Sequence, residues 1–323
     1  MSRILKIVLL LVALTLVTLS MSGWWLLRFD QIEEPQLPGT LERGVIEHDG
    51  LQRSWTAYVP KSVGKRPPLL LVLHGSMGRG EDMRIMSFYG FDAQAERGGY
   101  IAVYPDGYER HWNDCRASAS YAANTQNIDD VGFLRALVGE MERRYGVNSR
   151  QIYAAGFSNG GQMAFRLALE APDLVRGIAA ISASLPAQEN LGCQAGGGRV
   201  AALVINGTED PVNPYEGGMV KILWDDSRGP VISSVATAEY FAGLAGYGGS
   251  YLASNWPDKA PDDGTSVSSM RWSLPGRPPV ELLTVKGGGH TIPNPTFNLP
   301  RLTGTTSHEF DAPQVIWDFF EQR

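Results

Sequence analysis

Short apolar runs alternate with amphipathic stretches along most of the chain. Residues 69–73 form a continuous apolar run, which is typical of a strand buried on both faces of a parallel sheet. Residues 131–145 carry apolar side chains at helical spacing. Further strands are expected at 100–104, 151–155, 177–182, 200–205 and 281–285, and further helices at 163–169, 232–245 and 314–321. This alternation predicts an α/β fold with a mostly parallel central sheet and helices on both faces.

Turn and cap residues predict a hairpin at the start of the sheet and the two ends of one helix. Residues 44–47 and 52–59 flank the pair Asp49-Gly50, a hairpin signal, so two antiparallel strands should open the sheet. His48 belongs to this turn and is expected to be solvated. Asp129 and Asp130 are expected to cap the helix that follows them and that ends at Gly146. The domain is expected to cover residues 44–323.

The amino terminus carries a run of 21 residues, 7–27, without a charge. This is long enough to cross a bilayer as a helix. Arg3 and Lys6 precede the run, and Trp24 and Trp25 lie at its far end, so residues 1–28 are expected to be a signal anchor with the body outside. A cleaved signal peptide is the alternative, although no Ala-x-Ala site is present.

Residues 29–43 are polar, contain Pro35 and Pro38 and show no period, which predicts a linker between membrane and domain. The protein is therefore expected to be exported. It should lie on the periplasmic or extracellular face, either anchored in the inner membrane or secreted. The two cysteines, Cys115 and Cys193, are expected to form a disulfide in that compartment, although the sequence alone does not bring them together.

Composition excludes several classes of function. With 323 residues and 43% hydrophobic content, the chain can bury one large core. A net charge of −6 and the lack of a basic stripe argue against nucleic acid as a partner. The sequence shows no phosphate-binding glycine loop and no His/Cys cluster with metal spacing, so neither a cofactor nor a metal is expected.

The stretch Gly156-Phe157-Ser158-Asn159-Gly160 lies between an expected strand and an expected helix. This context is typical of a nucleophile elbow, where glycines on either side of a strained serine let neighbouring backbone pass. Ser158 is therefore the candidate nucleophile. The alternative is a serine in an ordinary strand-to-helix turn.

Two later residues lie where the acid and the base of a catalytic triad are expected in such a fold. Asp210 follows the second strand after the elbow, and His290 follows the last strand, in the order Ser, Asp, His. Glu209 is the local rival of Asp210, and His308 is the rival of His290. Residues 287–289, all glycine, are expected to form a flexible turn that swings the imidazole of His290 towards the nucleophile.

The strand at 69–73 runs into His74-Gly75-Ser76, which resembles the oxyanion loop of α/β-hydrolases. The backbone N–H groups of Ser76 and Asn159 are expected to bind the developing oxyanion. His74 is expected to brace the loop rather than transfer a proton.

The loop 108–115 follows another strand at the edge where open α/β sheets bind ligands. Trp112 is our candidate substrate-binding residue, and packing under the loop is the alternative. His111 is expected to be exposed. Residues 214–230 and 246–279 are rich in Gly, Asp and Pro and are expected to form a lid and pocket walls.

Taken together, these motifs resemble the secreted α/β-hydrolase esterases grouped as polyhydroxybutyrate depolymerase-like and feruloyl esterase-like. The matching stretches are LHGSMG (73–78), YPDGYERHWND (104–114), DDVGFLRALV (129–138), GFSNGGQMA (156–164), NGTEDPVNPY (206–215), PDDGT (261–265) and VKGGGHTIP (285–293). The resemblance implies Ser158 as nucleophile, Asp210 as acid and His290 as base. It also implies esters of hydroxycinnamic acids on plant polysaccharide, or of short hydroxyalkanoates, as substrates.

The sequence thus predicts a serine carboxylic ester hydrolase whose partner is a small or oligomeric ester. A polyhydroxybutyrate depolymerase proper and a serine peptidase, which uses the same triad on amides, are the alternatives within enzymes. A non-catalytic carbohydrate- or protein-binding module is the alternative outside them, and would be expected to lack a triad member. The sequence shows no separate binding domain after the closing helix, which makes insoluble polyester a less expected substrate.

Overall fold

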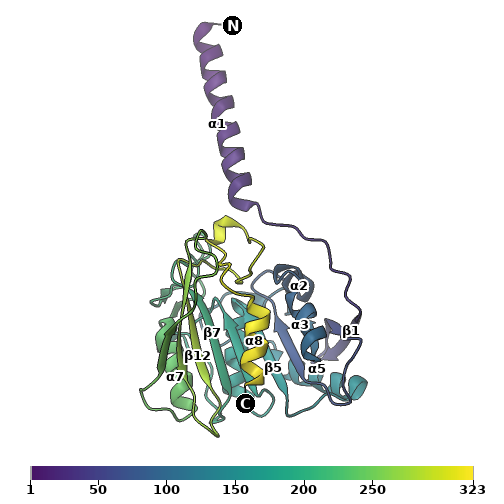
Figure 1. Cartoon of the computed structure of the whole chain (residues 1–323). Coiled ribbons are helices and arrows are strands. Elements are labelled where there is room, and N and C mark those ends of the chain that lie inside the picture. Colours follow the sequence, from purple (N-terminus) through teal and green to yellow (C-terminus); the bar gives the residue numbers. More distant parts are fainter. Residues whose placement is uncertain (1, 323) are drawn as a thin grey trace.

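A ten-stranded sheet forms the centre of the computed structural model, which describes residues 2–322 (Figure 1). The strand order is β1-β2-β4-β3-β5-β6-β7-β12-β11-β10. The strands are β1 (Thr40–His48), β2 (Leu51–Val59), β3 (Leu69–Leu73), β4 (Ile101–Pro105), β5 (Ile152–Phe157), β6 (Gly177–Ile181), β7 (Ala201–Gly207), β10 (Leu252–Asn255), β11 (Ser266–Trp272) and β12 (Val280–Lys286).

The six central strands, in the order β4-β3-β5-β6-β7-β12, pair in parallel. Antiparallel strands flank them at both edges of the sheet. The predicted hairpin of β1 and β2 is confirmed at one edge, where Asp49 and Gly50 both adopt positive φ angles, of 50° and 73°. Its first strand begins at Thr40, four residues before the expected start at Gly44. The parallel strands place their carboxyl ends along one side of the sheet, which we call the catalytic end.

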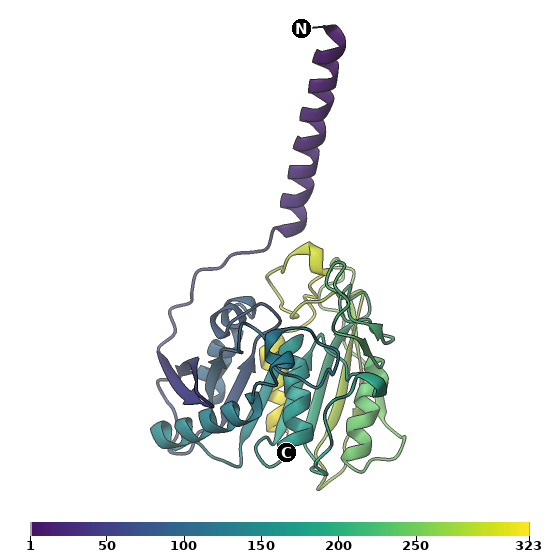
Figure 2. The same cartoon turned by 180° about the vertical axis from the view of Figure 1, so that it is seen from behind.

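Helices cover both faces of the sheet, as predicted (Figures 1 and 2). One face packs against α5 (Asp130–Tyr145), α6 (Asn159–Glu170) and α7 (Ser234–Leu244), around Phe133, Phe165 and Phe241. The other packs against α2 (Gly80–Met86), α3 (Gly90–Gly98) and α8 (Ala312–Glu321), around Phe91 and Trp317. The short α4 (Ala122–Thr125) lies in the loop after β4. Cap signals explain α5, because Asp129 accepts a hydrogen bond from the N–H of Gly132 (2.9 Å) and Gly146 ends the helix with φ 65°.

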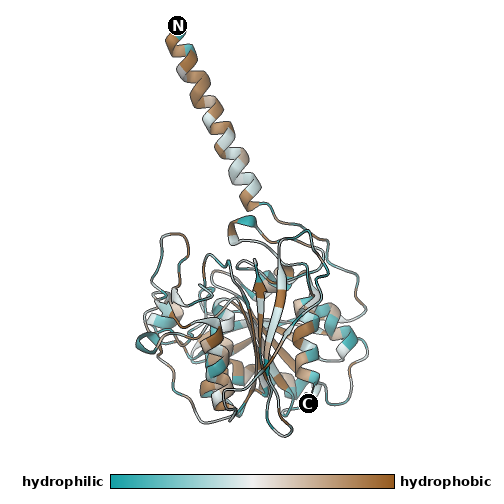
Figure 3. Ribbon diagram, turned by 60° about the vertical axis from the view of Figure 1, so that its left-hand side comes forward, coloured by the Kyte–Doolittle hydropathy of each residue, from teal (hydrophilic) through white to brown (hydrophobic). Residues whose placement is uncertain are grey.

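The amino-terminal helix α1 (Arg3–Leu27) stands away from the body (Figure 1). It is long and apolar enough to cross a membrane, with mean hydropathy 2.5 and none of its most apolar window buried. Figure 3 shows mostly brown and pale residues along it, without a continuous polar face. The predicted apolar helix is confirmed.

The two segments expected to form a lid and pocket walls differ from each other in structure. Residues 246–279 do not form only pocket walls, because they contain β10 and β11, which extend the sheet beyond β12. Residues 214–230 do form an excursion from the catalytic end of β7. Gly218–Met219 (β8) pairs there with Pro230–Val231 (β9), which reaches one residue past the expected segment.

Candidate active site

Ser158 occupies the sharp turn between β5 and α6. Its backbone angles are φ 53° and ψ −115°, a region that non-glycine residues rarely adopt, so the turn is strained. The side chain is half-buried, whereas Phe157 and Asn159 on either side of it are buried. This geometry is that of a nucleophile elbow rather than of an ordinary turn.

The glycines on either side of Ser158 are required by close backbone contacts. A Cβ at Gly156 would lie 2.1 Å from the carbonyl oxygen of Gly160, and a Cβ at Gly160 would lie 2.2 Å from that of Leu73. Both separations are far shorter than real contacts allow. The elbow therefore depends on glycine at these positions because α6 starts directly against β3.

Asp210 and His290 come together after β7 and β12, which are neighbours in the sheet. His290 Nδ1 lies 2.7 Å from Asp210 Oδ2, and both side chains are buried. Asp210 Oδ1 accepts hydrogen bonds from the backbone N–H groups of Val212 and Asn213, both at 2.7 Å. The carboxylate is thus fixed by its own loop and orients the imidazole. The alternative candidates do not take part in this contact. Glu209 is exposed. His308 Nδ1 lies 2.6 Å from the carbonyl oxygen of Asn294.

The glycines before His290 pack tightly and do not form the flexible turn expected from the sequence. A Cβ at Gly289 would lie 2.4 Å from the carbonyl oxygen of Thr303, and Gly287 adopts φ 73°. The N–H of His290 donates to the carbonyl of Thr303 (2.6 Å), and that of Gly289 donates to Thr305 (2.9 Å). The histidine is therefore held in place by a hydrogen-bonded loop.

The imidazole of His290 reaches the elbow. Its ring centroid lies 4.9 Å from that of Phe157, the residue directly before Ser158. The N–H of Ser158 donates to the carbonyl of Ile181 (2.8 Å), which ties the elbow to the end of β6. The ends of β5, β7 and β12 thus carry Ser158, Asp210 and His290 at the catalytic end.

The loop after β3 lies against the elbow from the other side. A Cβ at Gly75 would lie 3.1 Å from the ring of Phe157, so Ser76 follows a residue that touches the elbow. His74 braces this loop, as expected: its Nδ1 donates to the carbonyl of Gly75 (2.7 Å) and its Nε2 accepts from the N–H of Gly107 (2.8 Å). Burial lowers the pKa of His74 to about 4, so the ring is neutral.

Trp112 has no exposed surface, which corrects its assignment as a substrate-binding residue. Its indole Nε1 donates to the carbonyl of His74 (3.0 Å), and the two rings lie 5.0 Å apart. Trp112 instead packs under the loop, which was the alternative expected from the sequence. A buried indole needs a hydrogen-bond acceptor, and the carbonyl of His74 provides one.

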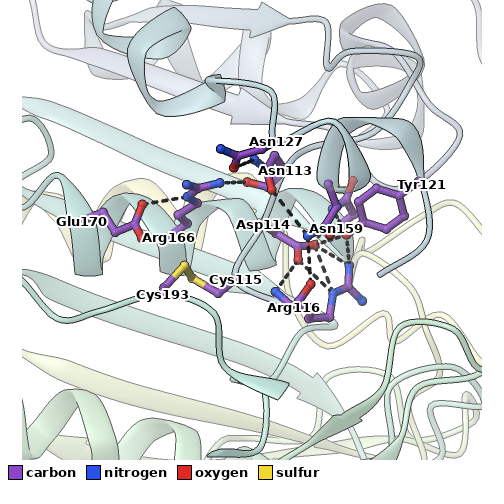
Figure 4. The surroundings of a disulfide bond; sticks show 11 residues. Asn113, Asp114, Cys115, Arg116, Tyr121, Asn127, Asn159, Arg166, Glu170 and Cys193 are labelled. Carbon is purple, nitrogen blue, oxygen red and sulfur yellow. Dashed lines mark hydrogen bonds and ion pairs between the residues drawn. A yellow bond between two sulfur atoms is a disulfide. The ribbon is translucent and has the colours of Figure 1, made fainter. Parts of the chain in front are cut away.

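Asn159 has a second role that the sequence did not reveal. Its side-chain Oδ1 accepts from the N–H of Trp112 (2.8 Å), and its Nδ2 donates to the carbonyl of Trp112 (3.1 Å). The same Nδ2 donates to Asp114 Oδ2 (2.6 Å) (Figure 4). Asn159, which follows Ser158, therefore clamps residues 112–114 against the elbow. We call this set of bonds the Asn159 clamp.

A buried ion pair and the disulfide support the Asn159 clamp (Figure 4). Asp114 accepts from Arg116 Nη2 (2.5 Å) and from the hydroxyl of Tyr121 (2.7 Å). Between Asp114 and Arg116, Cys115 is bonded to Cys193 with an S–S distance of 2.04 Å, which confirms the expected disulfide. The only signal in the sequence was the run of polar residues Asn113, Asp114 and Arg116 around Cys115, because Asn159 lies 45 residues along the chain from Asp114.

Two other histidines are less exposed than expected. His48 is half-buried, and its Nε2 lies 2.9 Å from Asp129 Oδ2. His111 is half-buried and stacks on Tyr121 with a centroid distance of 4.7 Å.

Asp130 is more than a helix cap, because it is fully buried and pairs with Arg53 at 2.6 Å. Asp129 and Asp130 thus support the structure, and neither contacts the triad residues in the bonds described. Within residues 2–322 no group of three or more His, Cys, Asp or Glu side chains is arranged to hold a metal ion.

A cavity of about 450 Å³ lies at the other end of the sheet. It is lined by Arg176, Ala201 and Pro279, which precede or begin β6, β7 and β12. Because this is the amino end of the parallel strands, the cavity lies at the opposite end of the sheet from Ser158, Asp210 and His290.

Comparisons with known proteins agree with this architecture. A family model described as phospholipase/carboxylesterase matches residues 100–221. The putative esterase NocK of Nocardia uniformis subsp. tsuyamanensis is 34% identical over 262 residues, which cover 78% of this chain and 73% of that protein. Feruloyl esterase C of Emericella nidulans is 32% identical over 187 residues, or 56% of this chain and 62% of that protein. An acetyl xylan esterase from Aspergillus awamori has the same fold, with a TM-score of 0.54 and 17% identity over 79% of this chain and 96% of that one.

The fold and the elbow define an α/β-hydrolase. The chain belongs to the phospholipase/carboxylesterase family of these hydrolases and is a carboxylic ester hydrolase. The predicted resemblance to feruloyl esterases is confirmed, because feruloyl esterases are among the relatives. The resemblance to polyhydroxybutyrate depolymerases stays a prediction.

Proposed function

We propose that Ser158, His290 and Asp210 form a catalytic triad that cleaves carboxylic esters through an acyl-enzyme. Ser158 attacks the ester carbonyl while His290 takes its proton, and Asp210 holds the imidazole and stabilises its charged form. The N–H groups of Ser76 and Asn159 bind the oxyanion of the tetrahedral intermediate. His290 then gives its proton to the leaving alcohol, and water repeats the sequence to release the acid.

The observation that carries this proposal is the 2.7 Å contact of His290 with Asp210, beside an elbow in which Ser158 is strained. The substrates we propose are feruloyl or other hydroxycinnamoyl esters of plant polysaccharide fragments, or soluble hydroxyalkanoate oligomers. The similarity to feruloyl esterases supports the first class. We also propose that the protein is exported and keeps α1 as a membrane anchor, supported by the length and hydropathy of that helix.

The test compares hydrolysis of methyl ferulate, p-nitrophenyl acetate and a soluble hydroxybutyrate oligomer by the wild type and by Ser158→Ala. The substitution should lower turnover by about 10⁶. Ser149→Ala, at an exposed serine before β5, is the matched control and should keep full activity. The preferred ester then identifies the substrate class. Activity that survives in Ser158→Ala would refute the triad.

A further inference from the structure

Residues 29–39, part of the segment 29–43 that was expected to be a linker, are fastened to the body. We call them the strap. The N–H of Asp30 donates to the carbonyl of Asn298 (3.0 Å). Asp30 Oδ2 in turn accepts from the N–H (2.7 Å) and the side-chain Nδ2 (3.1 Å) of Asn298. These bonds lower the pKa of Asp30, so its carboxylate stays charged and bound at neutral pH.

The strap has further fastenings along the body. The carboxylate of Glu34 pairs with Arg84, whose side chain is 2% exposed. Ile32 and Leu37 pack against the core on the α3 and α8 face. The N–H of Gly39 donates to the hydroxyl of Tyr58 (2.9 Å). A chain with bonds at its start, middle and end leaves α1 little freedom to move relative to the domain.

The strap begins at the catalytic end. Asn298 belongs to the segment that follows His290 and leads to α8. The same segment contains the short helix η2 (Arg301–Thr303), where the guanidinium of Arg301 lies over the ring of Trp25, 4.9 Å from its centroid. Figure 1 accordingly shows α1 leaving the body beside this yellow segment. A membrane crossed by α1 would therefore face the end of the sheet that carries the triad.

Exposed apolar side chains lie on the loops of this end. The excursion after Asp210 exposes Leu223 and Trp224 by 64% and 90%, and η2 exposes Leu302 by 47%. Tryptophan is favoured in the boundary layer between water and lipid, where its ring is apolar and its N–H can still be hydrated. Asp225 and Asp226 follow Trp224, which argues against attraction to anionic lipid and for an apolar contact with neutral lipid.

We propose that the strap holds the catalytic end towards the bilayer that α1 crosses, and that Leu223 and Trp224 rest in its interfacial layer. This inference rests on the retention of α1, which is part of the proposed function. In this orientation, substrate enters through the gap between the protein and the membrane. Small soluble esters and esters borne by the membrane reach Ser158 there, whereas large polymer particles do not.

The experiment uses the full chain in phosphatidylcholine nanodiscs. Trp224→Cys and, separately, Leu274→Cys are labelled with an environment-sensitive fluorophore while the Cys115–Cys193 bridge stays oxidised. Leu274 is the matched control, because it is 52% exposed and lines the cavity at the opposite end. Nitroxide-labelled phosphatidylcholine should quench the probe at 224 about threefold or more above the probe at 274, since interfacial side chains sit within the headgroup boundary.

Strap variants test what sets the orientation. Asp30→Ala should reduce the difference between the two probes, whereas Glu33→Ala, at a neighbouring exposed carboxylate, should leave it unchanged. Equal quenching at both positions, or stronger quenching at 274, overturns the orientation. An unchanged difference in Asp30→Ala overturns the role of the strap.

Separate readouts distinguish these failures from those of the proposed function. Mass spectrometry of the protein recovered from membranes shows whether residues 1–28 are retained, and their loss overturns the anchor and with it this inference. Hydrolysis of methyl ferulate by the same nanodiscs reports on the triad alone, because the quenching of the probes does not depend on catalysis.

Discussion

The side-chain amide of Asn159 donates a 2.6 Å hydrogen bond to Asp114, so the residue after Ser158 is bound to the residue before the bridged Cys115. Asn159 also holds both backbone groups of Trp112. The same residue is proposed to donate its own N–H to the oxyanion. Its side chain and its backbone would therefore serve two connected tasks, since the position of that N–H depends on the clamp.

Asn159→Ala separates these tasks, because it keeps the backbone N–H and removes the clamp. We expect kcat to fall about 10-fold to 100-fold with a smaller change in KM, less than the loss of a whole oxyanion donor. Steady-state kinetics on p-nitrophenyl acetate measure this. Asn124→Ala is the control, because Asn124 donates to the carbonyl of Arg116 (2.9 Å) without reaching the elbow. A wild-type kcat in Asn159→Ala would show that the elbow does not need the clamp.

Removing the disulfide should destabilise the protein more than it slows catalysis. The Cys115–Cys193 bridge closes a loop with a sequence separation of 78 residues. Loop-closure entropy for that length amounts to about 4 kcal/mol of unfolding free energy. We expect Cys115→Ser with Cys193→Ser to lower the free energy of unfolding in urea by about 2–4 kcal/mol, with kcat changed less than in Asn159→Ala. Equal stability of the bridged and unbridged proteins would contradict this.

The sequence predicted the parallel core well because its strands are buried on both faces and read as continuous apolar runs. Residues 69–73 and 201–205 are of this kind, and the side chains there are buried. It missed β10, whose four residues Leu252–Asn255 are all exposed, because an exposed edge strand carries no burial pattern. Such a strand forms only because β11 offers it a partner.

The candidate site likewise contains residues that local sequence predicts and contacts that it does not. Ser158, Asp210 and His290 could be predicted because each follows a strand in a fixed order. The Asn159 clamp could not, since its partners are 45 and 47 residues away in the chain. The fastening of the strap to Asn298, across 268 residues, is likewise invisible to local pattern. Long-range polar contacts of this kind depend on the finished fold.

Gly160→Ala should disrupt the elbow although it adds only a methyl group. The new Cβ would meet the carbonyl oxygen of Leu73 at 2.2 Å, so either α6 or β3 must move. We expect a loss of stability of about 1–3 kcal/mol, as for other overpacked sites, together with a large loss of activity. Gly139→Ala on α5 is the control, because a Cβ there has no atom within 4 Å and should keep stability and activity. Thermal unfolding and ester hydrolysis check both variants.

His74 should make the folded protein sensitive to mild acid. Its pKa is about 4 in the folded state, because burial disfavours the charged ring, against 6.5 for the free group. Between these values the unfolded chain binds a proton that the folded chain does not, so stability falls as the pH drops from about 6.5 to about 4. The shift corresponds to a loss of about 3 kcal/mol at most, and above pH 7 the group has no effect.

The pH dependence of unfolding in urea, compared between the wild type and His74→Gln, isolates this contribution from those of other groups. Asp92, for example, has a pKa raised by burial to about 6 and acts in the opposite direction over part of the same range. His74→Gln should be less stable at pH 7, because one side chain no longer joins Gly75 to Gly107, but it should lose less further stability on acidification. NMR of the imidazole should show the Nδ1–H tautomer of His74 down to about pH 5, since the folded ring protonates only near 4. A His74 ring that titrates near 6.5 in the folded protein would contradict the burial argument and the bracing role together.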